Sequence, residues 1–265
     1  MAHKISVANQ KGGVGKSTSV INIGSKLAAL GYKTLLVDQD AQSSATFATT
    51  NLVKIIEDDV PTMNEVMLGE AHIKDIIIPL DEYSDNLFLA PATLELSDAE
   101  LTIVNATMRE TILARELKTV DDDFDFILID CPPARGLLTI NALAASDYVL
   151  IPLQADYLAY VGVNLLYNTI MNVKEYINPK LKILGYFITM AERTLHANDV
   201  KEQSKRDFEK LGLNMLGSVS RATAVKDAIL AGMDIYNYDP KNKVAQQYEE
   251  LTNAIINEVN TKEHE

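Results

Sequence analysis

Residues 9–18 read Asn9-Gln10-Lys11-Gly12-Gly13-Val14-Gly15-Lys16-Ser17-Thr18. They follow a short apolar run, Ile5 to Ala8, and they lead into a segment with helical spacing, Lys16 to Leu30. A strand, a glycine-rich loop and a helix in this order are what a phosphate-binding loop requires, because glycines let backbone N–H groups converge on phosphate oxygens and the helix N-terminus adds partial positive charge. Lys16 can reach the β- and γ-phosphates, and the Ser17 hydroxyl can ligate Mg²⁺. The stretch therefore predicts a nucleotide phosphate site with its metal ion.

Short apolar runs rich in β-branched residues alternate along the chain with longer segments of helical spacing. The further predicted strands are Thr34 to Val37, Leu87 to Leu89, Phe126 to Ile129, Tyr148 to Ile151, Ile183 to Ile188 and Leu216 to Val219. The further predicted helices are Leu96 to Thr119, Val161 to Tyr176, Val200 to Leu211 and Val244 to Val259. This alternation predicts a single doubly wound α/β domain over residues 1–265, with a mostly parallel, twisted sheet flanked by helices. The phosphate loop after the first strand makes this a P-loop NTPase fold. We expect the acidic tail, about residues 260–265, to be frayed.

Composition limits the kind of protein and its surroundings. The 265 residues include 37 acidic and 24 basic side chains, a formal net charge of −13, so nucleic-acid binding needs a local basic patch. The single cysteine, Cys131, excludes an internal disulfide framework and any cysteine-rich metal site made by one chain. No signal core and no run of about 18 apolar residues is present, which favours a cytoplasmic protein.

Carboxylates follow two further predicted strands. Asp38 and Asp40 end the run that begins at Leu35, and because they stand two residues apart in extended chain they point the same way. Asp130 ends the apolar run Phe126 to Ile129 and is expected to hold Mg²⁺ directly or through water. Ligands of parallel α/β sheets bind beyond the carboxyl ends of the strands, where these groups and the phosphate loop would meet. The alternative for Asp38 and Asp40 is that they are solvated carboxylates at the end of a strand.

The pattern Lys-Gly-Gly-x-Gly-Lys-[Ser/Thr] resembles the deviant Walker A motif of the ParA/MinD ATPases. Gln10 stands where the common phosphate-loop pattern has a glycine, and Lys11 looks like the signature lysine of that family. The resemblance implies that Lys11 crosses a nucleotide-sandwich homodimer to the partner's ATP, which is charge stabilisation in trans. The segment Asp38 to Gln42 resembles the family's Asp-x-Asp-Pro-Gln with Ala41 in place of proline, which implies that Asp40 positions or activates the attacking water.

The resemblance therefore implies an ATPase with ATP and Mg²⁺ as cofactors and slow intrinsic turnover. The expected catalytic residues are Lys11, Lys16 and Asp40. The expected nucleotide contacts are Lys11, Gly12, Gly13, Val14, Gly15, Lys16, Ser17 and Thr18. The expected metal side comprises Ser17, Asp38 and Asp130. Cys131 has no evident activating partner, which favours a packed residue over a nucleophile.

Within the family, residues 9–13 and Tyr238-Asp239-Pro240 look closest to short-form ParA/Soj-type DNA-partition ATPases. This implies an ATP-bound dimer that binds DNA without sequence preference, associates with the nucleoid, and is released when a ParB-type partner stimulates hydrolysis. The last predicted helix carries Glu249, Glu250 and Glu258 and has no basic face, so we expect no membrane partner. Two alternatives stay open: a ParA-like ATPase that positions a protein cargo on the nucleoid, and a MinD-like membrane-associated regulator.

DNA binding without sequence preference requires Lys or Arg side chains at phosphates. By rough alignment Arg193 is one such position, and Lys201 and Lys205 share a face of the next helix. The stretch from Ser220 to Ala228 resembles a DNA-contacting segment of the family and offers Arg221 and Lys226, although Ala224 stands where Soj-like members carry an arginine. The alternative for each lysine is an ordinary solvated helix face.

Overall fold

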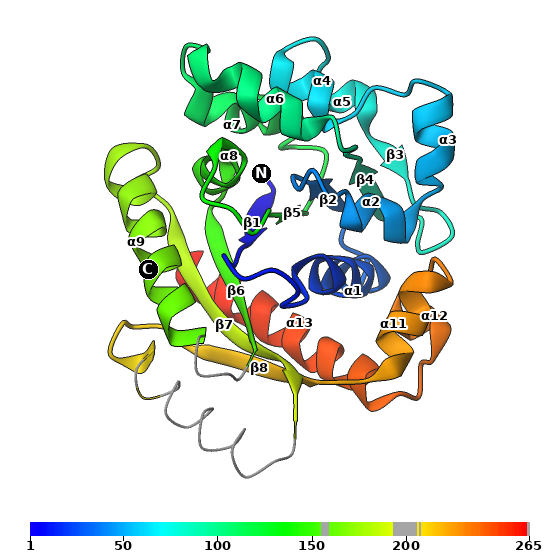
Figure 1. The fold of residues 1–265 in the computed structure, drawn as a ribbon. Helices are drawn as coiled ribbons and strands as arrows, with labels where there is room; N and C mark the ends of the chain where they lie inside the picture. The colour runs from blue at the N-terminus through cyan, green and yellow to red at the C-terminus, as the bar shows by residue number, and fades with distance from the viewer. Residues whose placement is uncertain (155–158, 193–205, 207, 264–265) are drawn as a thin grey trace.

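The structure is a computed structural model that describes residues 1–154, 159–192, 206 and 208–263. The described strands form one sheet of eight strands in the order β3-β4-β2-β5-β1-β6-β7-β8 (Figure 1). Neighbouring strands are parallel except for β3 and β4, which are antiparallel. The strands are β1 (His3–Val7), β2 (Thr34–Asp38), β3 (Ile78–Pro79), β4 (Leu87–Ala90), β5 (Phe126–Asp130), β6 (Tyr148–Gln154), β7 (Lys182–Ala191) and β8 (Met215–Ser220). The predicted α/β fold with a mostly parallel sheet is confirmed.

The central strands are apolar along their whole length because both faces of the sheet are covered. In β2, Leu35 and Val37 pack into the core on one face and Leu36 packs into the core on the other. The same alternation divides Ile127 and Leu128 of β5.

Helices cover the sheet in two layers (Figure 1). One layer comprises α1 (Lys16–Ala29), α11 (Thr223–Leu230), α12 (Ile235–Tyr238) and α13 (Lys243–Glu263). The other comprises α4 (Met63–Leu68), α5 (Ile73–Ile76), α6 (Leu96–Thr102), α7 (Ile112–Leu117), α8 (Leu137–Ala145) and α9 (Ala159–Tyr176). Two short helices, α2 (Ser44–Thr49) and α3 (Leu52–Glu57), follow β2.

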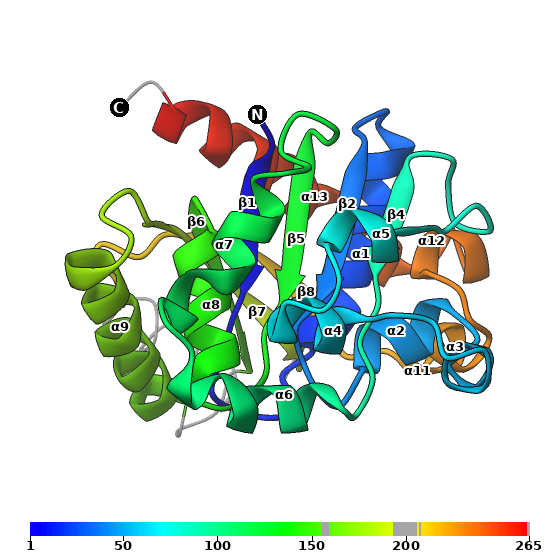
Figure 2. The same ribbon diagram turned by 90° about the horizontal axis from the view of Figure 1, so that it is seen from above.

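One predicted helix is interrupted. The segment from Leu96 to Thr119 consists of α6, the 3-10 turns Ile103–Asn105 and Arg109–Thr111, and α7. Ala106 is extended, and Met108 takes a left-handed conformation with φ 56°, so a continuous helix cannot form there. The break lets α6 lie beyond the carboxyl end of β5, as Figure 2 shows, while α7 packs against α8. Most of the predicted helix Val200 to Leu211 lies outside the described residues.

The last helix extends farther than the sequence predicts. The predicted helix ends at Val259, whereas α13 continues to Glu263, where Lys182 Nζ donates to the Lys262 carbonyl at 2.6 Å and Lys262 pairs with Glu258 at 3.2 Å. The fraying of the tail stays a prediction, since residues 264–265 lie outside the described residues. The apolar side of α13, which includes Leu251 and Ile255, is buried against the rest of the core. Within the described ranges, no helix has the length and apolar character that crossing a membrane requires.

The strand order brings the predicted site residues to one edge of the sheet. Asp38 at the end of β2 and Asp130 at the end of β5 are direct register partners. On its other side β5 pairs with β1, where Val7 aligns with Asp130. The phosphate loop leaves β1 at this point, so both carboxylates lie beside it.

Candidate nucleotide-binding site

The phosphate loop connects β1 to α1 and depends on two glycines with positive φ. Gly13 has φ 72°, and Gly15, which precedes the first turn of α1, has φ 83°. These conformations are accessible to glycine at little cost. A Cβ added at Gly12 or Gly13 would meet no heavy atom within 4 Å among the described residues, so the loop forms an open cradle. The first turn of α1 contains no acidic residue that would compete with an anion at the helix N-terminus.

Side chains fix the loop at both ends. Asn9 Nδ2 donates to the Pro152 carbonyl of β6 at 2.6 Å, while Asn9 Oδ1 accepts from the backbone N–H of Lys11 at 2.9 Å. At the other end, the Thr189 hydroxyl of β7 donates to the Val14 carbonyl at 2.8 Å. The cradle is therefore preorganised by the neighbouring strands.

Asp38 is fully buried and is held by α2. Its Oδ2 accepts hydrogen bonds from the Thr46 backbone N–H at 2.8 Å and from the Thr46 hydroxyl at 2.7 Å. Burial raises the pKa of Asp38 to about 6, although the bonds from Thr46 oppose the rise. One of its oxygens is thus committed to positioning the segment that follows β2.

Asp130 is fully buried but has a different environment. Neither carboxylate oxygen has a hydrogen-bond partner among the described residues. Burial raises its pKa well above the usual range, and the negative charge of Asp38 adds to the rise, while the Ser17 hydroxyl and the Lys16 ammonium lie close enough to oppose it. An uncompensated buried carboxylate is costly, and a cation at this place would offset that cost.

This donor set fits Mg²⁺ bound together with a nucleotide. The described residues contain no cluster of three or more His, Cys, Asp or Glu side chains that could hold a metal alone. Mg²⁺ commonly uses one or two carboxylates, water and substrate phosphates in place of an all-protein cage. Asp130, with Ser17 across from it and Asp38 beside it, supplies such a partial set.

Asp40 is placed at the same edge but is oriented by its own loop. Its backbone N–H donates to Asp38 Oδ1 at 3.3 Å, and its Oδ1 accepts from the backbone N–H of Gln42 at 3.0 Å. The residue is 7% exposed and lines the cavity over the phosphate loop. A carboxylate in this position can orient a water molecule near a terminal phosphate.

Two adjoining cavities meet at the loop. The first, which we call the phosphate cavity, has a volume of about 430 Å³ and is lined by Gly12, Gly13, Gly15, Lys16, Ser17, Thr18, Asp40 and residues of α2, among others. The second, the adjoining cavity, has a volume of about 560 Å³. The two cavities adjoin each other, because both are lined by Gly13, Gly15, Thr18, Met190 and Ile229.

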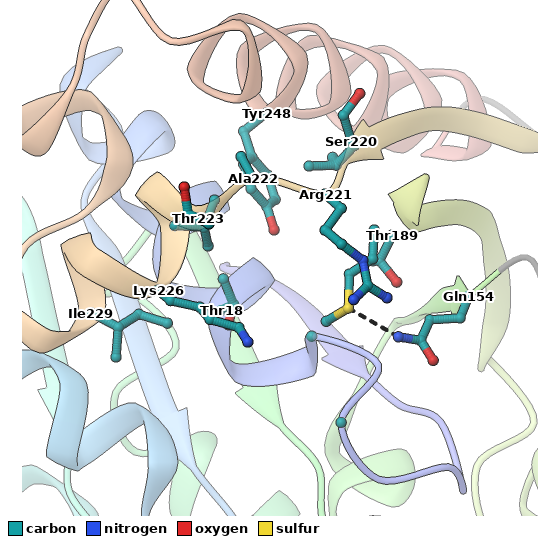
Figure 3. A pocket seen from close by; sticks show the side chains of 15 residues that line it. Thr18, Gln154, Thr189, Ser220, Arg221, Ala222, Thr223, Lys226, Ile229 and Tyr248 are labelled. Carbon is teal, nitrogen blue, oxygen red and sulfur yellow. Dashed lines mark hydrogen bonds between the residues drawn. The ribbon is translucent and has the colours of Figure 1, made fainter. Parts of the chain in front are cut away.

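The adjoining cavity is shaped by the segment that follows β8 and by α13. In Figure 3 the side chains of Arg221, Thr189 and Gln154 lie on one side of it, and those of Lys226 and Thr18 lie on the other. Its lining combines apolar surface with a few polar groups, which suits a flat heterocycle joined to phosphates in the first cavity.

Two predicted nucleotide contacts differ from their neighbours. Val14 is 1% exposed and packs inward, so only its backbone can face a nucleotide. Lys11 is not among the described residues that line the phosphate cavity, whereas Lys16 is. Lys11 Nζ instead donates to Gln154 Oε1 at 3.1 Å.

Cys131 is fully buried, and burial raises the pKa of its thiol to about 12, as expected for a packed residue.

Comparison with known proteins agrees with this geometry. The family model described as an AAA domain matches residues 2–183. The chromosome-partitioning ATPase Soj of Treponema pallidum is 38% identical over 257 residues, which cover 97% of this chain and 98% of that protein. The chain belongs to the ParA/Soj family of ATPases. Another similar family member is the sporulation initiation inhibitor protein Soj of Bacillus subtilis, 38% identical over 96% of this chain and 98% of that protein.

A solved structure similar to this ParA/Soj-family chain is that of cobyrinic acid a,c-diamide synthase from Mycobacterium smegmatis with bound ADP and magnesium. It has a TM-score of 0.83 and 34% identity, and the match covers 99% of this chain and 97% of that one. The two chains therefore share the whole fold, although the names of the relatives denote different activities.

The predicted DNA-binding residues of this ParA/Soj-family ATPase separate into two groups. Arg193, Lys201 and Lys205 lie outside the described residues. Arg221 and Lys226 line the adjoining cavity. The Arg221 guanidinium is exposed and pairs with Glu192 at 3.2 Å.

Sequence reasoning assigned no role to three residues that shape the site. Gln154 holds Lys11 and also donates to Met190 Sδ at 2.9 Å. Met190 has φ 50° and lies between the two cavities. Thr46 holds Asp38. The position of Gln154, a polar residue at the carboxyl end of an apolar strand, was a signal; Met190 and Thr46 had none.

Proposed function

We propose that this chain is an ATP-dependent dimer switch for DNA partition, in plasmid or chromosome segregation. As a member of the ParA/Soj ATPases it uses ATP and Mg²⁺ and hydrolyses ATP to ADP and phosphate. In the proposal, two ATP-bound subunits close over their nucleotides, bind DNA without sequence preference on the nucleoid, and separate when a ParB-type partner stimulates hydrolysis.

Each group at the site has a distinct task in this proposal. The glycine cradle and the first turn of α1 bind the phosphates through backbone N–H groups. Lys16 neutralises phosphate charge, and Asp40 orients the attacking water. Ser17 and Asp130 would hold Mg²⁺, directly or through water, with Asp38 fixed behind them. When bound, the metal supplies positive charge against the phosphates.

The position of Lys11 is the main support for the proposed dimer. It directly precedes Gly12, which lines the phosphate cavity, yet the Lys11 ammonium is directed to Gln154 at the end of β6. A lysine that lies beside its own phosphate cavity but outside the lining can turn to the nucleotide of a second subunit that faces the same edge of the sheet, once it leaves its contacts within its own subunit. A charge delivered in trans couples turnover to dimer formation.

Closing the dimer also explains how a chain with a net charge of −13 could hold DNA. One local basic surface gives weak binding, and two joined surfaces bind as a bivalent unit whose affinity far exceeds that of either alone. Arg193, Lys201, Lys205, Arg221 and Lys226 are the proposed contributors. Removing one side chain that binds a DNA phosphate should reduce the slope of log affinity against log salt by about 0.9.

The deciding experiment measures retention of a nonspecific DNA duplex at moderate salt with ATP, with ADP and without nucleotide. DNA should be retained with ATP but not with ADP or without nucleotide. The fraction of DNA retained with ATP should fall in Arg193→Ala. Arg115→Ala is the matched control. Arg115 is exposed on α7, and among the described residues its guanidinium donates hydrogen bonds to the nearby Met108 carbonyl and Thr111 hydroxyl. Equal retention in all nucleotide states, or none in any, would overturn the partition switch and leave the ATPase assignment intact.

A further inference from the structure

A side-chain hydrogen bond joins the phosphate loop to the loop that follows Asp130. Arg135 Nε donates to Gln10 Oε1 at 3.0 Å, between residues 125 positions apart in the chain. Gln10 is the residue that stands where the common phosphate-loop pattern has a glycine. The Gln10 amide nitrogen is buried and has no partner among the described residues, so Arg135 is the contact that orients this side chain.

The backbone that carries Arg135 is fixed on both sides. The Thr139 hydroxyl donates to the Ala134 carbonyl at 2.6 Å. A Cβ at Gly136 would collide with the Glu100 carboxylate, and that carboxylate accepts from the Leu138 backbone N–H at 3.1 Å. Arg135 therefore projects from a loop that α6 and α8 hold in place.

The two halves of the phosphate loop are held differently. The second half has its own anchors, because Thr189 holds Val14 and Gly15 leads directly into α1. The first half, which carries Lys11, is held by Asn9 on the β6 side and by the Gln10 side chain on the β5 side. Loss of the Arg135 bond should therefore disturb Lys11 and leave the cradle that grips the phosphates intact.

We propose that Arg135 is a positioning residue for ATP hydrolysis. It acts through Gln10 and sets the course of the loop that carries Lys11 relative to the loop that follows Asp130. The inference rests on the proposed function where it assigns Lys11 to the partner's nucleotide. It predicts a defect in turnover with nucleotide affinity preserved, which a general loosening of the fold would not produce.

The test compares ATP turnover and ATP affinity in Arg135→Ala, Gln10→Ala and the double variant. Each single change is expected to lower kcat about tenfold while the Kd for a fluorescent ATP analogue stays within about twofold. The double variant is expected to turn over no more slowly than the weaker single variant, because both changes remove the same hydrogen bond. Gln10→Glu retains an acceptor for the guanidinium and should restore kcat.

Arg115→Ala again serves as the control and should keep full turnover. The proposal is overturned by normal kcat in Gln10→Ala, by effects that multiply in the double variant, or by a loss of ATP affinity that matches the loss of kcat. Light scattering of the unmodified protein with ATP is measured alongside. If that protein hydrolyses ATP without dimerising, the dimer switch fails. The turnover numbers of the unmodified protein, the two single alanine variants and the double variant still decide whether Arg135 acts through Gln10.

Discussion

The Lys11 ammonium donates a 3.1 Å hydrogen bond to Gln154 Oε1 of its own subunit. Lys16, five residues later, lines the phosphate cavity. The two lysines of one short motif are thus directed to different places, and this difference gives them separable roles. Removing each in turn should separate nucleotide binding from the step that needs a second subunit.

We expect Lys11→Ala to bind ATP nearly as well as the unmodified protein but to lose ATP-dependent dimers, with turnover reduced about 100-fold or more. Lys16→Ala should lose affinity for ATP itself, because Lys16 lines the subunit's own phosphate cavity. Titration with a fluorescent ATP analogue, light scattering and phosphate release would distinguish them. Equal loss of ATP affinity in both variants would contradict the role in trans.

Gln154 should oppose dimer formation, because Lys11 must leave it to reach a partner. A hydrogen bond to a charged group contributes about 1.5 to 3 kcal/mol, and about 1.4 kcal/mol is tenfold, so Gln154→Ala should dimerise at a protein concentration at least about tenfold lower in saturating ATP. Gln154→Glu should act in the opposite direction, since a carboxylate holds the ammonium more strongly. Sedimentation of both variants across a concentration series gives the measurement, and a shift in the same direction for both would refute the explanation.

Asp40→Ala is expected to form ATP-dependent dimers that persist, because hydrolysis falls about 100-fold or more while the phosphate cradle is unchanged. The side chain accepts a hydrogen bond from Gln42 of its own loop, so the fold should tolerate its removal. Asp75→Ala, which removes an exposed carboxylate from α5, is the control. Normal phosphate release by Asp40→Ala would exclude the water-orienting role.

The elements that the sequence predicts well are those specified by local pattern. The run from Leu35 to Val37 is apolar because both faces of β2 are buried, and the phosphate loop is marked by glycines whose conformation other residues rarely adopt. Asp38 and Asp130 could be placed at one edge because the carboxyl ends of parallel strands meet there.

The partners of these residues could not be predicted in the same way. Lys11 meets Gln154 and Gln10 meets Arg135 across more than a hundred intervening residues, and such pairs depend on strand order and loop course. The left-handed backbone at Met108 also divided a segment whose apolar spacing indicated one helix. The roles of Arg193, Lys201 and Lys205 stay predictions.

Glu65 should stabilise the fold mainly above its own pKa. It completes a capping box at the start of α4, where its carboxylate accepts from the Thr62 backbone N–H at 2.6 Å. Burial tends to raise the pKa of Glu65, but the hydrogen bonds from Thr62 and Asn64 outweigh it and lower that pKa below its usual value. A lowered carboxyl pKa contributes stability that is present above the unfolded value and is lost as pH falls through the folded one.

Accordingly, Glu65→Ala should reduce the free energy of unfolding by about 1 kcal/mol at neutral pH and by less as pH falls below about 4. Urea unfolding at several pH values measures the difference. Glu57→Ala, an exposed acid near the end of α3, should change little at any pH. A loss for Glu65→Ala that is independent of pH would argue against the ionised cap.

Asp130→Asn should uncouple stability from function. The carboxyl group is buried with no hydrogen-bond partner among the described residues, and burial raises its pKa well above the usual range, which favours the neutral acid when no cation is bound. A neutral amide of the same shape resembles that acid. The free energy of unfolding without nucleotide should therefore be unchanged or higher.

The stabilisation by bound nucleotide should behave differently. A ligand at 100 times its Kd raises the free energy of unfolding by about 2.7 kcal/mol, and the part of this increase that requires Mg²⁺ should disappear in Asp130→Asn along with hydrolysis. Thermal unfolding with ATP, in Mg²⁺ and in EDTA, measures both effects. Destabilisation of the nucleotide-free variant by several kcal/mol would instead make Asp130 a structural residue, and it would remove the main protein ligand from the proposed metal site.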